Sequence, residues 1–409
     1  MSSKWSTGKL GSFVELKRGY DLPQAKRQSG SVPLVSSSGV SDQHDVAMVK
    51  GPGVVTGRYG TIGQVFYIEE DFWPLNTTLY VRNFKGNEPK FIHYFLKTLD
   101  FLAYSDKAAV PGVNRNHLHE ALVTVPSHAA QKEIANFLGV LDDRITLLRE
   151  TNATLEAIAQ TLFKSWFVDF DPVRAKMEGR APEGMDEATA ALFPDGFEES
   201  ELGVVPRGWR VIPVGDVAEA VGGATPDTKN PLFWEPGIHC WTTPKDLSGI
   251  AAPLLLDTER KLSAQGLAKI GSGLLPVGSL LMSSRAPIGY LALAQVPLAI
   301  NQGYIALLPG GLLPPLYMYF WCAQNMEGIK ARANGSTFME ISKKAFRPMP
   351  ALIPPAQVIQ AFVDAAGTLF QRLVENERQA QTLISLRDSL LPRLISGQLL
   401  LPEADALVA

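Results

Sequence analysis

The sequence predicts a mixed α/β (α+β) fold with two similar globular domains, separated by a pair of long antiparallel coiled-coil helices with pseudo-two-fold symmetry. Two observations lead to this prediction. A segment that begins near Gly53 recurs, in order, roughly 226 residues later. Each copy also ends in a long stretch whose apolar residues alternate in steps of four and three. A repeat period of this length is too great for a solenoid and indicates two whole domains.

The repeat consists of short motifs that occur in the same order in both copies. Gly57-Arg58-Tyr59-Gly60 corresponds to Ser284-Arg285-Ala286-Pro287, and Asn76 corresponds to Asn301. Short β-branched and aromatic runs between Gly and Asn turns predict strands, and an amphipathic helix follows in each copy, near 91–102 and near 317–329. The expected strands cover residues 54–56, 65–68 and 79–81 in the first copy and 279–283, 290–294 and 304–308 in the second.

Composition and periodicity together predict the domain boundaries. Pro, Gly and acidic residues cluster between Asp171 and Pro206, where the apolar periodicity fades. We therefore expect a linker there that runs along the surface. The predicted division is a first globular domain at 1–126, a helix at 127–170, the linker at 171–205, a second globular domain at 206–354, a helix at 355–398 and a tail at 399–409.

Each predicted long helix carries an apolar seam with the 3.5-residue period of a coiled coil. The first seam runs from Ile134 to Trp166 and the second from Phe362 to Leu394. The alternative is that each helix merely packs on its own domain. A stripe that faces a domain core usually broadens beyond such a narrow seam.

The seams also predict how the two helices pair. In an antiparallel pair whose facing residue numbers sum to 528, Asn152 meets Asn376 and Trp166 meets Phe362. A parallel pair would leave both amides without their partner, at roughly 1–3 kcal/mol apiece. We therefore expect the two asparagines to set the register of an antiparallel pair. About 33 residues at 1.5 Å each make a rod of roughly 50 Å, with one domain at either end.

The composition is that of an ordinary soluble protein, with 46% hydrophobic and 19% charged residues. Cys240 and Cys322 are the two cysteines and both fall in the second copy, so we expect a reducing cytoplasm rather than a disulfide framework. The first residues lack the apolar core of a signal peptide. The uncharged stretch 286–326 contains five prolines, which favours buried strands over a membrane-spanning helix.

The charges are distributed unevenly along the chain. Residues 1–126 carry 14 basic and 11 acidic side chains, and residues 206–354 carry 13 and 9. Residues 127–205 carry 7 basic and 15 acidic side chains, and residues 355–409 carry 4 and 6. Two mildly basic domains joined by acidic helices favour a polyanion that is bound at two places.

Motifs for catalysis and for metal binding are missing from the sequence. There is no phosphate-binding loop, no dinucleotide fingerprint and no His-Glu-x-x-His. Asn230-Pro231-Leu232-Phe233 is a faint match to an adenine-methyltransferase loop, and Glu88-Pro89-Lys90 with Asp71 to a nuclease site. A metal site needs a second clustered pair of ligands, and neither His117 with His119 nor His239 with Cys240 has one. We therefore predict no catalytic residue and no metal site in this chain.

Polar loops remain as the candidate binding residues. Arg and Asn are the side chains that read guanine and adenine edges, while Ser, Thr and Lys hold phosphates. Ordinary polar loops are the alternative, and the Arg58/Arg285 correspondence is the strongest indication against it. The DNA-binding candidates are Lys17, Arg18, Tyr20, Arg58, Tyr59, Asn114, Arg115, Asn116, Thr243, Lys245, Arg285 and Thr337.

Two motifs mark the first long helix: Ala129-Ala130-Gln131-Lys132-Glu133-Ile134 at its start and Trp166-Phe167-Val168-Asp169-Phe170-Asp171-Pro172 at its end. The second copy adds Pro355-Ala356-Gln357 and Leu390-Leu391-Pro392-Arg393-Leu394-Ile395-Ser396-Gly397. Through these motifs the chain resembles the specificity subunit of type I restriction-modification systems. These motifs are individually loose, but their order and duplication span essentially the whole chain. Arg387 departs from the pattern because it places a charge in the seam, where we expect it to reach solvent or to pair with a partner subunit.

The resemblance implies a non-catalytic DNA-binding subunit. Two target-recognition domains would each read one half of a split, asymmetric double-stranded DNA sequence, and the paired helices would act as a ruler. Two modification subunits would bind along the acidic spacer, supply S-adenosylmethionine and methylate adenine. Restriction subunits would bring ATP- and Mg²⁺-dependent cleavage. A bivalent adaptor that binds two protein or glycan ligands is the alternative function, and a free-standing nuclease or methylase is a third.

Overall fold

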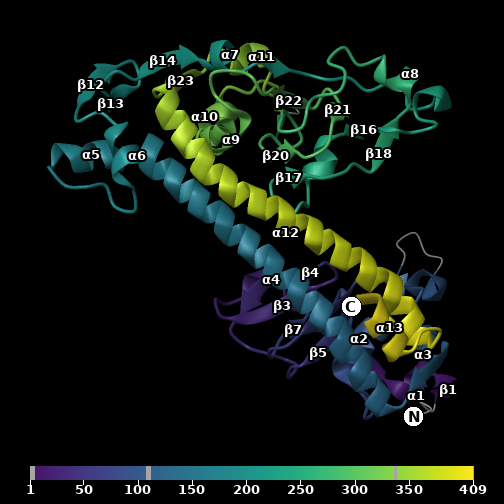
Figure 1. The fold of residues 1–409 in the computed structure, drawn as a ribbon. Coiled ribbons are helices and arrows are strands. Elements are labelled where there is room, and N and C mark those ends of the chain that lie inside the picture. Colours follow the sequence, from purple (N-terminus) through teal and green to yellow (C-terminus); the bar gives the residue numbers. More distant parts are fainter. Residues whose placement is uncertain (1–4, 107–111, 336–338, 409) are drawn as a thin grey trace. The chain divides into compact units, whose positions relative to one another are not determined.

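The computed structural model describes residues 5–106, 112–335 and 339–408. The chain forms two compact units, which we name unit 1 (Met1–Thr146 with Gln381–Ala409) and unit 2 (Leu147–Ala380). Two long helices, α4 (His128–Phe167) and α12 (Ala356–Ser396), contribute residues to both units. Each unit therefore contains a part of α4 and a part of α12 (Figure 1).

Unit 1 is built around a four-stranded sheet with the strand order β2-β8-β5-β6 and a three-stranded sheet with the order β4-β3-β7. Helix α2 packs on β5 and β6. The strands are β1 (Trp5–Lys9), β2 (Glu15–Arg18), β3 (Val32–Ser36), β4 (Gly39–His44), β5 (Gly53–Gly57), β6 (Val65–Ile68), β7 (Trp73–Pro74), β8 (Thr78–Asn83), β9 (Ser105–Asp106), β10 (Gly112–Val113) and β11 (Leu122–Pro126). The short helices are α1 (Leu10–Phe13), η1 (Gln24–Lys26), α2 (Pro89–Lys97), η2 (Phe101–Tyr104), α3 (Arg115–His119) and α13 (Leu401–Val408).

Unit 2 has a five-stranded sheet with the order β15-β22-β19-β20-β17 and a three-stranded sheet with the order β18-β16-β21. Helix α9 packs on β19 and β20. The strands are β12 (Phe197–Ser200), β13 (Gly203–Pro206), β14 (Arg210–Pro213), β15 (Ala220–Val221), β16 (His239–Thr242), β17 (Leu254–Leu255), β18 (Arg260–Leu262), β19 (Leu280–Ser283), β20 (Leu291–Ala294), β21 (Leu298–Ile300), β22 (Tyr304–Leu307) and β23 (Pro350–Ile353). The short helices are α5 (Asp171–Met177), α6 (Glu187–Ala191), α7 (Val214–Val217), η3 (Pro231–Phe233), η4 (Pro244–Leu247), α8 (Ala264–Leu267), α9 (Pro315–Gln324), α10 (Met326–Ala331) and α11 (Lys343–Phe346).

The two units share one topology. In both large sheets the central strand, β5 or β19, is antiparallel to both of its neighbours. In both small sheets the central strand, β3 or β16, has one antiparallel and one parallel neighbour. The pair β1–β11 has its equivalent in β14–β23. The repeat in the sequence is therefore a repeat of the fold.

The expected helices and strands differ from the structure mainly at their ends. Helix α2 ends at Lys97, and η2 follows after Asp100, whose carboxylate accepts the Leu102 and Ala103 amides. The second expected helix is interrupted at Asn325, between α9 and α10. The uncharged stretch 286–326 forms β20, β21, β22 and α9, and none of the described helices combines the length and the apolar character that crossing a membrane requires.

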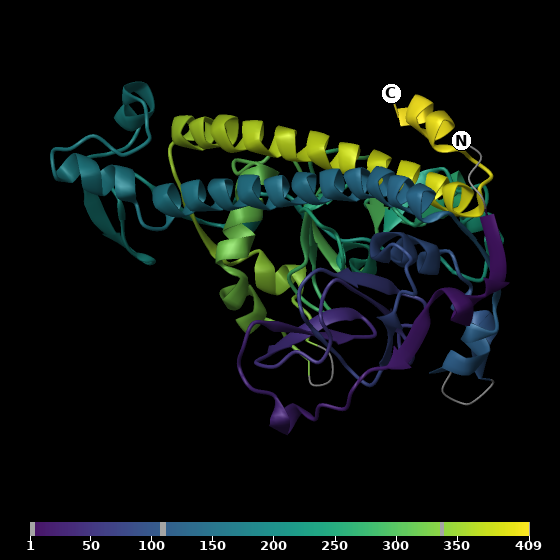
Figure 2. The ribbon, with the colours of Figure 1, turned by 90° about the horizontal axis from the view of Figure 1, so that it is seen from below.

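Within unit 2, α4 and α12 run side by side in opposite directions (Figures 1 and 2). Asn376 Nδ2 donates to Asn152 Oδ1 at 3.0 Å, and both amides are 2% exposed. The Trp166 and Phe362 ring centres are 6.1 Å apart. These two pairs have the facing positions that the seams predicted for an antiparallel pair. That the asparagines set the register stays a prediction.

The buried stripe on each long helix is broader at its end than a coiled-coil seam. Phe163, Phe167 and Phe370 lie outside the seam positions and are buried in the core of unit 2. Ala135 and Leu391 are buried in the same way in unit 1. This breadth agrees with the alternative expectation, because each helix also packs on a globular domain. That the two helices form a coiled coil stays a prediction.

Within unit 1, the charged seam residue Arg387 has partners on its own chain. Arg387 Nη1 donates to Asp142 Oδ1 at 2.6 Å, and Nη2 donates to Asp388 Oδ1 at 2.7 Å. Tyr94 OH donates to Asp142 Oδ2 at 2.6 Å. Arg387 thus pairs inside the chain, and not in the ways that the sequence suggested. Burial would raise the pKa of the Asp142 carboxyl, but the bonds from Tyr94 and Arg387 outweigh it and hold this pKa below its ordinary value.

The segment at 171–205, which we expected to be a surface linker, is folded against unit 2. It forms α5, α6 and the β12–β13 hairpin. Val173 and Phe193 are buried, and the Phe193 ring lies 5.2 Å from the Trp166 ring at 87°. A few apolar anchors are enough to hold this segment in place, and they are too sparse to produce a periodic signal in the sequence.

We predict that Asn152→Leu will destabilise the protein by about 1–3 kcal/mol, because it leaves the buried Asn376 amide without its side-chain partner. Asn152→Leu combined with Asn376→Leu should regain stability but lose the preference for one register. Urea unfolding and cysteine cross-linking across α4 and α12 measure the two effects. Ser389→Ala, an exposed change on α12, is the control. A single variant as stable as the wild type, or a double variant that keeps one register, would contradict this assignment.

We predict that Asp142→Ala will cost about 2–3 kcal/mol, because it removes the partner of a half-buried arginine and of a tyrosine hydroxyl. The pKa of Asp142 is lowered by folding. Its contribution is therefore present above the unfolded pKa and is lost as the pH falls through the folded value. Unfolding measured at pH 7 and near pH 3 should show a smaller difference between wild type and variant at low pH. The neighbouring Asp143→Ala, which breaks an exposed 3.9 Å pair with Lys90, should change stability by less than about 0.5 kcal/mol. An equal effect of both variants would refute the prediction.

Candidate nucleic-acid interface

In unit 1, one turn between β7 and β8 positions two of the candidate loops. The Tyr20 amide donates to Pro74 O at 2.8 Å, and the Arg58 and Tyr59 amides donate to Thr77 O at 2.9 and 3.2 Å. Gly19 is required there, because a Cβ at this position would lie 2.2 Å from Leu75 O. The structure therefore brings the loop after β2 and the loop after β5 to the same edge of the sheets.

Arg58 and Tyr59 are stacked on each other at this edge. The Arg58 guanidinium lies 4.5 Å from the centre of the Tyr59 ring, and Tyr59 is 36% exposed. In the part of the chain that the structure describes, Arg58 makes no ion pair. A charged, aromatic pair without an internal anionic partner suits a contact with a nucleic-acid backbone or base.

The candidates on and after β2 are held by neighbours in unit 1. Tyr20 OH lies 2.9 Å from Tyr80 OH, and Lys17 Nζ lies 3.5 Å from Tyr20 OH. The bond with Tyr80 lowers the pKa of Tyr20 more than its partial burial raises it. Arg18 Nη2 donates to Asp21 Oδ1 at 3.1 Å, so its charge is partly neutralised. Asp21 also accepts from Asn76.

Residues 114–116 join the same edge through the backbone. Val113 N–H donates to Arg58 O at 3.0 Å, and Tyr59 forms an isolated bridge with Gly112. Asn114 Oδ1 accepts the Asn116 amide at 3.0 Å and caps α3. Asn114 therefore stabilises the start of α3, whereas the side chains of Arg115 and Asn116 are exposed.

Unit 2 repeats this construction with different side chains. A Cβ on Gly223 would lie 1.7 Å from Ile300 O, as a Cβ on Gly19 would meet Leu75 O. The Ala224 amide donates to Ile300 O at 3.1 Å, and the Asn301 amide donates to Thr242 O at 3.1 Å. The Ser284 amide donates to Gly303 O at 2.7 Å. The loops that carry Thr243 and Arg285 therefore lie beside the turn at 301–303.

Two of the candidate residues of unit 2, Arg285 and Thr243, have side-chain partners within the unit. Arg285 Nη1 lies 3.6 Å from Glu340 Oε2. The Thr243 amide and hydroxyl both donate to Asp246 Oδ2, at 2.7 and 3.0 Å, and cap η4. Lys245 is exposed. Thr337 lies outside the described residues.

The structure adds residues to this edge that the sequence reasoning did not include as site residues. Thr225 Oγ1 donates to Gln302 Oε1 at 2.6 Å, where unit 1 has the Asp21–Asn76 pair. The Ser36–Ser38 loop follows β3 as Thr243 follows β16, and a Cβ on Gly57 would lie 3.1 Å from Ser37 O. Extending the repeat by one residue beyond Asn301 would have found Gln302, whereas Thr225 and residues 36–38 lie far from the asparagines in the sequence.

Two of the candidate metal ligands, His119 and Cys240, have other contacts. His119 Nε2 accepts the Leu16 amide at 2.9 Å, and Cys240 Sγ lies 3.3 Å from Asp257 Oδ1. Over residues 5–106, 112–335 and 339–408, no three His, Cys, Asp or Glu side chains are grouped closely enough to hold a metal ion.

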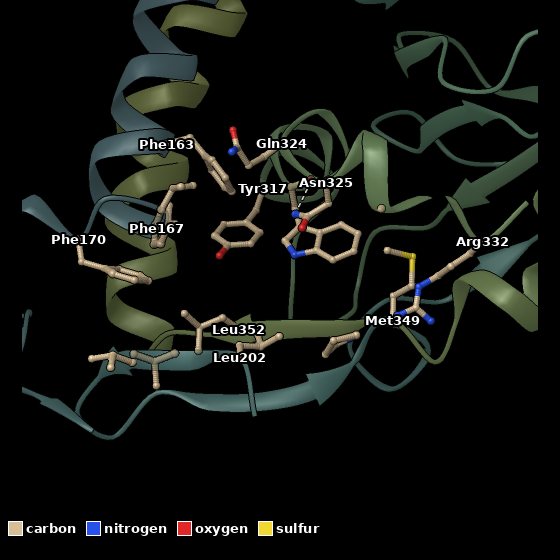
Figure 3. Close-up of a pocket in the computed structure, with 16 residues that line it drawn as sticks. Phe163, Phe167, Phe170, Leu202, Tyr317, Gln324, Asn325, Arg332, Met349 and Leu352 are labelled. Carbon is tan, nitrogen blue, oxygen red and sulfur yellow. Dashed lines mark hydrogen bonds between the residues drawn. The ribbon is translucent and has the colours of Figure 1, made fainter. Parts of the chain in front are cut away.

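Unit 2 also contains a cavity of about 480 Å³, away from the candidate loops (Figure 3). Phe163 and Phe167 of α4, Tyr317 of α9 and Leu352 of β23 line it, and Asn325 donates to Trp321 O at 2.9 Å beside it. None of the described candidate residues reaches this cavity.

Known proteins resemble this chain over most of its length. The family model for the type I restriction modification DNA specificity domain matches residues 2–157 and 206–382, one match for each copy of the repeat. The type I restriction enzyme HindI specificity subunit of Haemophilus influenzae is 26% identical over 339 residues, which cover 73% of either chain. The MjaIX specificity subunit of Methanocaldococcus jannaschii is 31% identical over 190 residues, 46% of this chain and 44% of the relative.

A solved structure has the same fold. The type I restriction-modification S subunit from M. genitalium superimposes with a TM-score of 0.56 at 17% identity, and the match covers 96% of both chains. At this identity the likeness concerns the fold. The family model, in contrast, matches more than half of the sequence, and the chain belongs to the family of type I restriction modification DNA specificity domains.

Proposed function

We propose that this chain binds double-stranded DNA through two separate surfaces, one on each unit, and so recognises a bipartite, asymmetric target. The observation that carries the proposal is the repeated edge. In both units an arginine, Arg58 or Arg285, follows the central strand of the large sheet, and a backbone amide of its loop, from Arg58 itself or from Ser284, donates to the turn after Asn76 or Asn301. Arginine in such a loop is suited to guanine edges and to phosphates.

The differences between the two edges support an asymmetric target. Tyr59 stacks beside Arg58, whereas Ala286 and Pro287 follow Arg285. Arg285 has Glu340 as its ion-pair partner, and Arg58 has no such partner among the described residues. Surfaces with different donors and different charge compensation select different base pairs.

The proposed partners are two modification subunits, which would bind along the acidic spacer helices, and restriction subunits that would join them. The relatives from Haemophilus influenzae and Methanocaldococcus jannaschii are named as specificity subunits of type I restriction enzymes. By this likeness the chain positions the catalytic partner subunits on the DNA and does not itself catalyse the reaction. S-adenosylmethionine, ATP and Mg²⁺ would bind to the partner subunits, and adenine would be the methylated base.

We predict that DNA binding by the complex of this chain with its modification subunits will fall steeply with salt. Each neutralised phosphate contributes about −0.9 to the slope of log K against log salt. Fluorescence anisotropy with a random duplex between about 50 and 200 mM salt measures this slope. Binding that is absent, or that does not depend on salt, would favour the adaptor that binds two protein or glycan ligands.

We predict that Arg58→Ala will relax base discrimination in one half of the target and Arg285→Ala in the other half, by about 1–3 kcal/mol at the affected base pair. The experiment measures binding to duplexes that carry substitutions in one half-site at a time. Arg82→Ala and Arg207→Ala remove arginines that are more exposed and already pair with Glu15 and Asp195, and they should leave discrimination unchanged. Equal loss at both halves in either variant would refute independent reading by the two units.

A further inference from the structure

Arg260, the first residue of β18, lies against two tryptophans of unit 2. Its guanidinium carbon is 3.5 Å from the centre of the Trp234 ring and 5.3 Å from the centre of the Trp241 ring. The two rings are 5.1 Å apart at 79°. Tryptophan attracts cations more strongly than any other aromatic residue. The two rings therefore hold the Arg260 side chain in a defined position.

Both tryptophans are themselves held by the backbone. Trp234 Nε1 donates to Asp227 O at 3.0 Å, and Trp241 Nε1 donates to Ala224 O at 3.2 Å. Trp241 is 2% exposed and packs with Leu262 and other apolar side chains. Because the platform is rigid, much of the conformational freedom that an arginine loses on binding is already lost in the free protein.

The charge of Arg260 is exposed and has no internal anionic partner. Nearby Asp257 pairs with Lys261 at 3.3 Å. Within the described ranges Arg260 makes no ion pair and no side-chain hydrogen bond, and its contacts are the two rings. A ring covers one face of the guanidinium, whereas the N–H donors lie at its edge. These donors are therefore available to an external anion.

Strand directions place Arg260 at the edge that carries the other candidates of unit 2. Arg260 begins β18 and is paired with Trp241, close to the carboxyl end of the antiparallel strand β16 (Figure 1). Thr243 follows two residues after Trp241. Strand β21 is parallel to β16 and also ends at this edge, where it leads to the turn at 301–303.

We propose that Arg260, stacked on Trp234 and Trp241, contacts a phosphate of the DNA backbone beside the half-site that unit 2 reads. This inference rests on the proposed function. A phosphate is favoured over a base because Arg260 is held by two rings, one of them buried, and cannot extend into a groove, unlike Arg58, which rests on the single, exposed Tyr59 ring. Phosphates lie on the outside of the duplex. Unit 1 has no counterpart, because β3 (VPLVS) contains no aromatic residue and β4 (GVSDQH) no arginine or lysine.

Binding of the complete complex to DNA, as a function of salt, tests the proposal with the variant Arg260→Ala. We expect a loss of affinity of about tenfold, as for one charge-assisted hydrogen bond, and a salt slope that is smaller by about 0.9. The loss should be equal on the preferred duplex and on a scrambled duplex, because a phosphate contact does not depend on sequence. Arg260→Lys keeps the charge but not the planar group, and its loss should be smaller.

Lys261→Ala is the matched control. It removes the same charge from the next position of β18, whose side chain points to the opposite face of the strand and pairs with Asp257. We expect an unchanged salt slope. Thermal unfolding of each variant shows that it is folded.

The outcomes separate this inference from the proposed function. If the wild-type complex binds no DNA, the proposed function fails. If the wild type binds and a folded Arg260→Ala variant keeps both affinity and slope, the platform merely covers Trp234 and the phosphate contact is refuted. A change of base preference with an unchanged slope would also refute it, in favour of base reading.

Discussion

The antiparallel pairing of α4 and α12 is the constraint on which both units depend. Unit 1 takes Leu390, Leu391, Leu394 and Ile395 from α12, with Leu399 and Ala404 after it, into a core otherwise formed by residues before 140. Unit 2 takes Phe163 and Trp166 from α4 into the core that Phe362 also enters. Full burial of each such side chain stabilises the fold by roughly 1.5–3 kcal/mol. Each core therefore includes residues of both long helices, which lie far apart in the sequence.

Each unit connects this rigid base to its polar loops through one backbone arrangement. The central strands β5 and β19 are buried along their whole length, and the arginine loops begin where these strands end. A glycine, Gly19 or Gly223, lets a second loop approach the same turn more closely than a Cβ would allow. The two units therefore present different side chains on the same backbone arrangement. A fold built in this way can carry different specificities.

The arginines of the two copies are compensated in two different ways. Arg18 and Arg285 have carboxylate partners, whereas Arg58 rests on Tyr59 and Arg260 on two tryptophans. A paired arginine must exchange one anion for another on binding, while a stacked arginine keeps its platform and adds an anion. The same residue type can therefore contribute to selectivity in one place and to affinity in another.

The sequence by itself determined the duplication, the two long helices and the pairing of their asparagines. Periodicity and repeat spacing are local properties that survive without knowledge of tertiary contacts. The tertiary structure decided what distant segments do together. It gave Arg387 its partner Asp142 and folded the 171–205 segment onto unit 2 through Phe193. It also brought Trp234, Trp241 and Arg260 together from three separate segments. Such contacts join residues far apart in the chain, and no local pattern records which of them will meet.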